Sequence, residues 1–180
     1  MKIVDIFAGK LFAMHYDGEK LNEYERLMEY WSYSDKIICF LDENIADIPS
    51  GVNVFNALSF IREESGIIDE QLVDIVFDEK KRLDEFFAPL SVHEYQMVVL
   101  SLSKGKAKVR RPRYLRLYAI RIDTDLYLVT GGAIKLPEQC KMQERSHTQK
   151  ELDKLHYIKD YLKDHGIFDN DSFCEFLNEQ

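Results

Sequence analysis

The strongest structural signal in the chain is a run of alternating side chains that ends at a turn. Residues 113–122 alternate with a period of two, the spacing of a β-strand whose two faces differ. The first face would carry Leu115, Leu117 and Ala119, and the opposite face Tyr114, Arg116, Tyr118 and Ile120. Asp123-Thr124-Asp125 would then turn the chain into a second strand over residues 126–130. Such a hairpin predicts a sheet on which the rest of the chain must pack.

Other β-prone runs are shorter. Residues 2–7 and 11–16 predict an N-terminal hairpin, because Ala8-Gly9-Lys10 separates them and Asp17-Gly18 follows. Gly131-Gly132 allows a bend or bulge before one more short strand over residues 133–136. Residues 91–103 fit either a short helix or a strand.

The acidic first half shows apolar residues at helical spacing. Tyr24, Leu27, Met28 and Trp31 form one such stripe. A second helix would begin at Ser34, a third would end at Gly66, and a fourth, from Leu72 to Phe87, would end before Pro89. Two overlapping capping boxes predict a helix over residues 146–166, and a last helix would hold Phe173.

These patterns predict an α+β fold. We expect residues 1–180 to form a single domain with a mostly antiparallel sheet, helices packed on one face of it, and a helical annex. Residues 20–90 would be an acidic helical insertion. Residues 104–147 would be the basic sheet core that carries the functional site.

Charge is sharply partitioned along the chain. Residues 104–145 carry 11 Lys and Arg against 4 Asp and Glu, whereas residues 1–90 carry 9 against 19 and residues 146–180 carry 4 against 8. The net charge of −8 argues against a protein that coats nucleic acid non-specifically, since that affinity grows with the number of phosphates neutralised. A shaped local patch could still bind a polyanion.

The cysteines and the apolar runs indicate the compartment in which the chain works. Cys39, Cys140 and Cys174 lie far apart, which indicates neither a disulfide framework nor a zinc knuckle. The first residues fit a signal peptide badly, and no apolar run approaches the ~20 residues that a membrane span needs. We therefore expect a cytoplasmic protein that makes no membrane contact.

The basic segment offers side chains that suit RNA. A strand face with Tyr114, Arg116 and Tyr118 would present aromatic rings and a guanidinium together, so that bases and phosphate could be bound at once. The RNA backbone would also contact Lys104, Lys106, Lys108, Arg110, Arg111 and Arg113. The alternative is that residues 104–113 pair with the protein's own acidic helices or with an acidic partner protein.

Proton transfer needs other groups, because an arginine stays charged and cannot accept a proton. His147, Tyr127 and Lys135 are the candidates, each within or beside the basic segment. The chain lacks a glycine-rich phosphate loop and the common hydrolase and metalloprotease motifs. We expect no metal and no other cofactor at the site.

Three segments together resemble the C-terminal half of RelE/HigB-type toxins of bacterial toxin–antitoxin systems. They are Tyr114-Leu115-Arg116-Leu117-Tyr118, Gly132-Ala133-Ile134-Lys135-Leu136 and His147-Thr148-Gln149-Lys150-Glu151-Leu152. The resemblance implies a compact antiparallel sheet with helices on one face, ribosome-dependent cleavage of messenger RNA, and neutralisation by a helix-turn-helix antitoxin. It also implies roles for Arg116 as the strand arginine that faces RNA, Arg121 as a second basic position, and Lys135 as the lysine at a strand end.

Two other functions compete with a type II toxin that acts as an endoribonuclease. In one, the chain is a non-catalytic interaction module whose basic hairpin docks an acidic protein. In the other, it keeps the toxin fold but inhibits a different target, such as gyrase.

Overall fold

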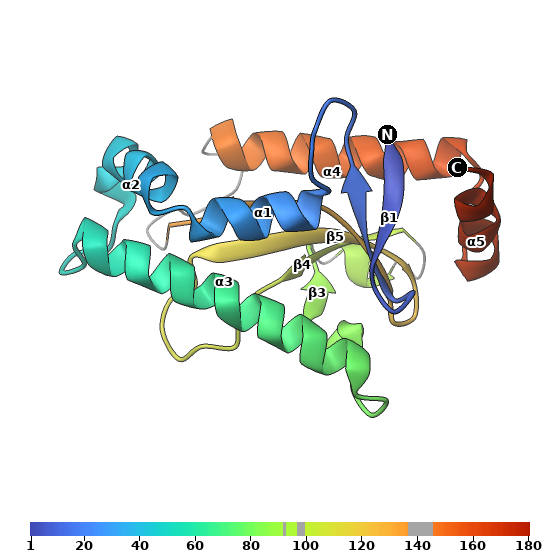
Figure 1. Ribbon diagram of the computed structural model, residues 1–180, viewed down its shortest axis with the longest axis horizontal. Helices are drawn as coiled ribbons and strands as arrows, with labels where there is room; N and C mark the ends of the chain where they lie inside the picture. Colours follow the sequence, from blue (N-terminus) through green and yellow to red (C-terminus); the bar gives the residue numbers. More distant parts are fainter. Residues whose placement is uncertain (92, 97–99, 137–145) are drawn as a thin grey trace.

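The computed structural model describes residues 1–91, 93–96, 100–136 and 146–180. Within them the strands form a six-stranded sheet with the order β1-β2-β6-β5-β4-β3 (Figure 1). The strands are β1 (Lys2–Phe7), β2 (Leu11–His15), β3 (Phe87–Pro89), β4 (Ser101–Gly105), β5 (Leu115–Asp123) and β6 (Leu126–Ile134). Neighbouring strands run antiparallel except for β2 and β6, which are parallel. The expected α+β class is confirmed, with a mixed sheet.

Five helices accompany the sheet in the described part of the chain. They are α1 (Glu23–Ser32), α2 (Ser34–Glu43), α3 (Val54–Phe77), α4 (Ser146–Asp164) and α5 (Asn170–Glu179). Side chains cap three of them: Asn22, Asn53 and Asp169 accept a backbone N–H in the first turn of α1, α3 and α5. The short 3-10 helices η1 (Ile45–Asp47), η2 (Leu83–Glu85) and η3 (His93–Gln96) lie in the connections.

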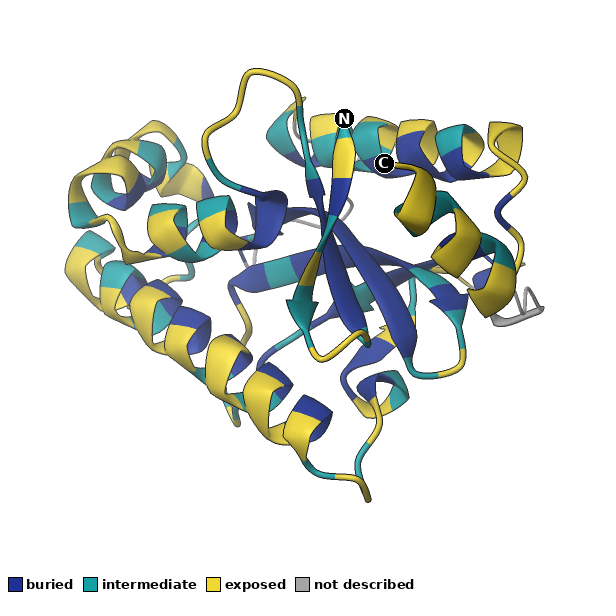
Figure 2. Cartoon of the chain, turned by 45° about the vertical axis from the view of Figure 1, so that its right-hand side comes forward, coloured by how far each residue is buried: buried dark blue, intermediate teal, exposed yellow. Residues whose placement is uncertain are grey.

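Helices cover both faces of the sheet, so the expectation of helices on one face is wrong. One hydrophobic core joins α1, α2 and α3 to Leu11, Leu117 and Val129, and a second joins α4 and α5 to Phe12 and Ile120. Figure 1 shows α4 along the top of the view and α3 along the bottom, with strands β4 and β5 between them. Figure 2 shows buried strands at the centre and helices exposed on their outer sides. The reason is that β5 and β6 are apolar on both faces, and each face needs a cover.

The alternation of β5 is confirmed. Leu117 and Ala119 belong to the core under α1 and α3, whereas Tyr118 and Ile120 belong to the core under α4. The irregularity expected at Gly131-Gly132 lies just before these glycines, because the register between β5 and β6 shifts between Val129 and Gly131. The strand expected over residues 133–136 is not separate, since β6 continues to Ile134.

The helix expected to stop at Gly66 does not stop there. Helix α3 runs unbroken from Val54 to Phe77, because its buried stripe continues through Ile61, Ile68 and Leu72. That packing outweighs the penalty of about 1 kcal/mol for a glycine inside a helix. The fourth expected helix is wrong as well: Leu83 lies in η2 and Phe87 in β3. Residues 20–90 therefore supply one helical layer of the fold and an edge strand.

Candidate functional site

A pocket of about 400 Å³ opens on the sheet face that α4 covers. Strand β5 supplies Arg116 and Tyr118, and Lys104 comes from the neighbouring strand β4. Lys106 follows β4, and Lys135 follows the last residue of β6. Four cationic side chains that are separated by as many as 31 positions in the sequence thus line one cavity.

Backbone carbonyls hold two of these cations in place. Arg116 Nη1 donates to the carbonyl oxygens of Leu115 at 2.6 Å and Arg113 at 3.1 Å. Lys104 Nζ donates to the carbonyl of Leu90 at 3.1 Å. Fixed donors of this kind lose little conformational entropy when an anion binds.

The positive charges in the pocket repel one another. Burial, and then the positive charges of Arg116, Lys104, Arg113 and Lys135, together lower the pKa of the Lys106 ammonium to about 8. The pKa of Lys104 is lowered by burial and then by Arg116 and Lys135. An anion in the pocket would relieve this repulsion, so the arrangement is one that favours anion binding.

One carboxylate lies among the residues that line the pocket. Glu94 is buried, and its Oε2 accepts the backbone N–H of Leu102 at 2.7 Å while its Oε1 lies 3.5 Å from Lys159 Nζ on α4. Glu94 is therefore already matched by a cation outside the pocket lining. Leu90, Leu102 and Leu152 give the pocket an apolar part, and Ser91 and His156 complete it.

Arg121 and Tyr127, both expected at the site, lie on the opposite face of the sheet. Arg121 Nε lies 3.2 Å from Asp84 Oδ1, and the Tyr127 hydroxyl donates to the same oxygen at 2.7 Å. Burial and then Asp84 raise the pKa of Tyr127, whose ring stacks on Phe87 at 4.6 Å. These side chains tie η2 and β3 to the sheet and do not reach the pocket with Arg116.

His147 lies apart from both groups. Its Nε2 lies 3.2 Å from the carbonyl oxygen of Ile134, and its ring meets the edge of Phe40 at 5.1 Å. Since the carbonyl can only accept, His147 donates there and links the start of α4 to the end of β6. The five residues expected to act together in catalysis are thus divided among three places.

The basic run is divided in the same way. Arg111 contacts Glu63 and Glu64 of α3 at 2.5 Å each and stacks over Phe60. The fully buried Glu64 also accepts the backbone N–H groups of Tyr114 and Leu115. For Arg111, pairing with the protein's own acidic helix is therefore the correct alternative.

Four more of the expected RNA-binding residues lie outside the pocket lining. Tyr114 is in the core beside Phe60, and Arg113 donates from Nε to the carbonyl of Ala107 at 2.8 Å. Lys108 and Arg110 are exposed. Of the thirteen residues expected at the site, the pocket brings together Lys104, Lys106, Arg116, Tyr118 and Lys135.

Sequence reasoning missed three polar residues of the pocket, Ser91, Glu94 and His156. His156 is exposed and lies one helical turn after Leu152 on α4, so its spacing from that residue could have revealed it. Glu94 had no such signal, because residues 91–103 showed no clear period.

No family model, no curated protein and no solved structure matches the chain. Among the residues that the structure describes, no group of three or more His, Cys, Asp and Glu side chains is placed to hold a metal ion. None of the described helices combines the length and apolar character needed to cross a membrane. Function must therefore be argued from the pocket itself.

Proposed function

We propose that the pocket binds the phosphate backbone of single-stranded RNA and that the chain cleaves it. The observation that carries this proposal is the convergence of Lys104, Lys106, Arg116 and Lys135 on one cavity of a protein whose net charge is −8. The apolar part of the pocket would accept a base beside the bound phosphate.

In the proposed reaction the RNA 2′-hydroxyl attacks the adjacent phosphorus. Lys106, in its neutral form, takes the hydroxyl proton, because its lowered pKa makes that form accessible near neutral pH. The P–O5′ bond breaks, and the Lys104 ammonium gives a proton to the leaving oxygen. The products are a 2′,3′-cyclic phosphate and a 5′-hydroxyl. Arg116 and Lys135 stabilise the charge that develops on the phosphorane oxygens.

The biological role that we propose is that of a toxin whose activity a partner protein restrains. It rests on the resemblance of the β5–β6 hairpin and α4 to RelE/HigB-type toxins, which implies messenger RNA on the ribosome as substrate and a helix-turn-helix antitoxin as partner. Expression of the chain alone should then arrest bacterial growth, and Arg116→Ala should relieve the arrest.

The direct test measures RNA binding and cleavage with purified protein and a labelled single-stranded RNA. Arg116→Ala should weaken binding at least tenfold, since it removes a charge-assisted contact to phosphate. Arg110→Ala is the matched control, because Arg110 is exposed in the same basic run but lies outside the pocket lining. Equal losses in the two variants would mean that RNA contacts the exposed run and not the pocket.

A second candidate is a non-catalytic interaction module. The acidic helical layer favours it, because residues 1–90 would repel a long nucleic acid that extends beyond the pocket. An anionic group of a protein would then fill the pocket. The absence of both RNA binding and 2′,3′-cyclic product at saturating protein would favour this candidate over the nuclease.

A further inference from the structure

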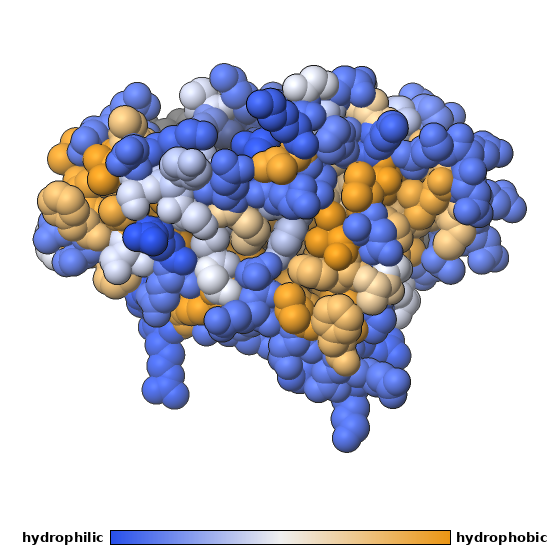
Figure 3. All heavy atoms as spheres, viewed as in Figure 1, coloured by the Kyte–Doolittle hydropathy of each residue, from blue (hydrophilic) through white to orange (hydrophobic). Residues whose placement is uncertain are grey.

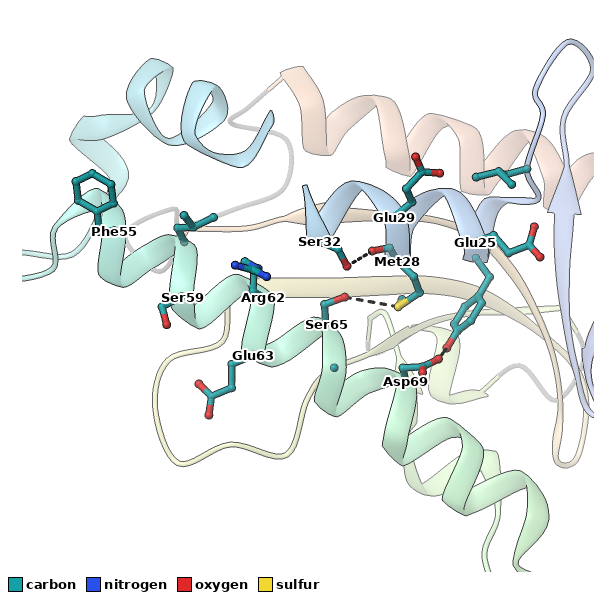
Figure 4. A pocket seen from close by; sticks show the side chains of 14 residues that line it. Glu25, Met28, Glu29, Ser32, Phe55, Ser59, Arg62, Glu63, Ser65 and Asp69 are labelled. Carbon is teal, nitrogen blue, oxygen red and sulfur yellow. Dashed lines mark hydrogen bonds between the residues drawn. The ribbon is translucent and has the colours of Figure 1, made fainter. Parts of the chain in front are cut away.

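A groove of about 910 Å³ lies between α1 and α3. Its lining side chains lie on and beside α1 and α3 (Figure 4), and it shares no lining residue with the sheet-face pocket. Its lining runs from Phe55 to Asp69 along α3, a length of about 21 Å at 1.5 Å per residue. A groove of this length matches about four turns of an incoming helix.

The floor of the groove is apolar and closely packed. Met28 of α1 and Ser65 of α3 meet there, with the Ser65 hydroxyl 3.7 Å from the Met28 sulfur. At one end the Tyr24 hydroxyl donates to Asp69 at 2.6 Å, which closes the floor. At the other end Phe55 remains 73% exposed. In Figure 3, which shows this side of the molecule, hydrophobic patches lie among hydrophilic ones.

The α1 rim of the groove is acidic, because it carries Glu25 and Glu29. On α3, the Glu63 carboxylate is already paired with Arg111, Asp69 accepts the Tyr24 hydroxyl, and Arg62 is cationic. Figure 4 shows the Glu29 carboxylate on the outer side of α1 and the Glu63 carboxylate on the outer side of α3. The acidic flank of the apolar floor is therefore the α1 side.

We propose that this groove docks an amphipathic helix of a partner protein, with apolar residues on the floor and Lys or Arg on the flank that faces α1. Charge complementarity with Glu25 and Glu29 selects the basic flank, and the apolar floor between two helices selects an amphipathic helix. A second copy of the chain is a poor occupant, because none of the five described helices has more Lys and Arg than Asp and Glu. The proposal does not depend on RNA cleavage.

The test uses the full chain and a synthetic 18-residue helical peptide with Leu at positions i, i+3, i+4 and i+7 and Lys elsewhere. Its twin has Glu in place of every Lys. Calorimetry should show saturable binding of the Lys peptide and no binding of the twin. The double variant Glu25→Gln, Glu29→Gln should weaken binding about five- to tenfold, the size expected for two partly exposed ion pairs. Phe55→Ser should weaken it by about tenfold through the lost apolar contact.

The control is Asp42→Asn, Glu43→Gln, which removes the same charge from exposed positions of α2 outside the groove. It should bind the Lys peptide as the unaltered chain does. The proposal is overturned if the control weakens binding as much as the rim variant, because attraction would then be non-specific. It is equally overturned if Phe55→Ser has no effect, or if the Glu peptide binds as well as the Lys peptide.

Discussion

Lys106 is the side chain whose proposed role depends most on its neighbours. Its pKa of about 8 means that the neutral amine becomes the main form only above that pH. We therefore expect kcat/KM for RNA cleavage to rise with pH up to about 8, since this ratio reports the free enzyme. A pH profile of cleavage by purified protein measures it.

Lys106→Arg separates the charge of this residue from its proton transfer. Arginine keeps the positive charge but cannot become neutral in this range. RNA affinity should stay within about threefold, whereas kcat should fall by about 10²-fold or more. A variant that still cleaves at the original rate would show that Lys106 is not the base.

Glu64 matters for the stability of the fold. It is fully buried and holds Arg111 together with the backbone N–H groups of Tyr114 and Leu115. Glu64→Gln would leave Arg111 without its buried counter-charge and would turn an amide N–H₂ toward donors. The free energy of unfolding should drop by about 3 kcal/mol, measured by chemical denaturation. The control Glu70→Gln, exposed on the same helix, should change it by less than about 0.5 kcal/mol.

The alternation of side chains along β5 decided which site residues could be predicted to lie on the same face. Arg116 and Tyr118 are two positions apart, so the alternation of β5 correctly placed them on one face. Arg121 is five positions from Arg116, and in a regular strand an odd separation puts the two side chains on opposite faces. The sequence therefore contained the information that separates Arg121 from Arg116, although the family resemblance suggested one shared site.

At the scale of elements, Gly131 and Gly132 let helices approach both faces of β6. A Cβ atom on Gly132 would lie 2.9 Å from the Arg116 carbonyl oxygen and 2.9 Å from atoms of Leu27 and Trp31 in α1. The Gly132 N–H donates to Glu151 of α4 at 3.0 Å. One dipeptide thus sets the spacing of both helical layers.

Gly132→Ala should lower the free energy of unfolding by about 1–3 kcal/mol, because its methyl group overpacks against backbone and α1. Gly66→Ala is the matched substitution, since a Cβ there meets nothing within 4 Å and lies inside α3. It should raise that free energy by as much as about 1 kcal/mol. Thermal unfolding of the two variants side by side gives the comparison, and a stable Gly132→Ala protein would contradict the proposed close packing.

The order of the elements along the chain was easier to predict than the face of the sheet that each helix covers. The two hairpins, α1 and the helix over residues 146–164 follow from local periodicity, which is fixed by neighbouring residues. Which face each helix covers depends on contacts between distant segments, and no local pattern records it. The prediction that a helix ends at Gly66 was wrong for the same reason. The apolar stripe that stabilises α3 on both sides of Gly66 does so because the sheet buries it.

At the scale of the whole molecule, the basic and acidic segments of the sequence form two separate surface sites of opposite charge. The sheet-face pocket is cationic, and the groove between α1 and α3 has carboxylates on its α1 side. If four cations contact phosphates, the logarithm of RNA affinity should fall with the logarithm of salt concentration with a slope of about −3. Titrations at several salt concentrations measure this slope. A slope near zero would mean that phosphate contacts do not carry the binding.

The parallel pairing of β2 with β6 also has a consequence during synthesis. Strand β2 ends at His15, and its neighbour β6 ends at Ile134. At roughly 5–20 residues per second, the ribosome would need about 6–24 s to add the intervening chain. During that time the first hairpin has an unpaired edge in the place that β6 will fill. The newborn chain would therefore be open to chaperones or to wrong strand partners until translation passes the second hairpin.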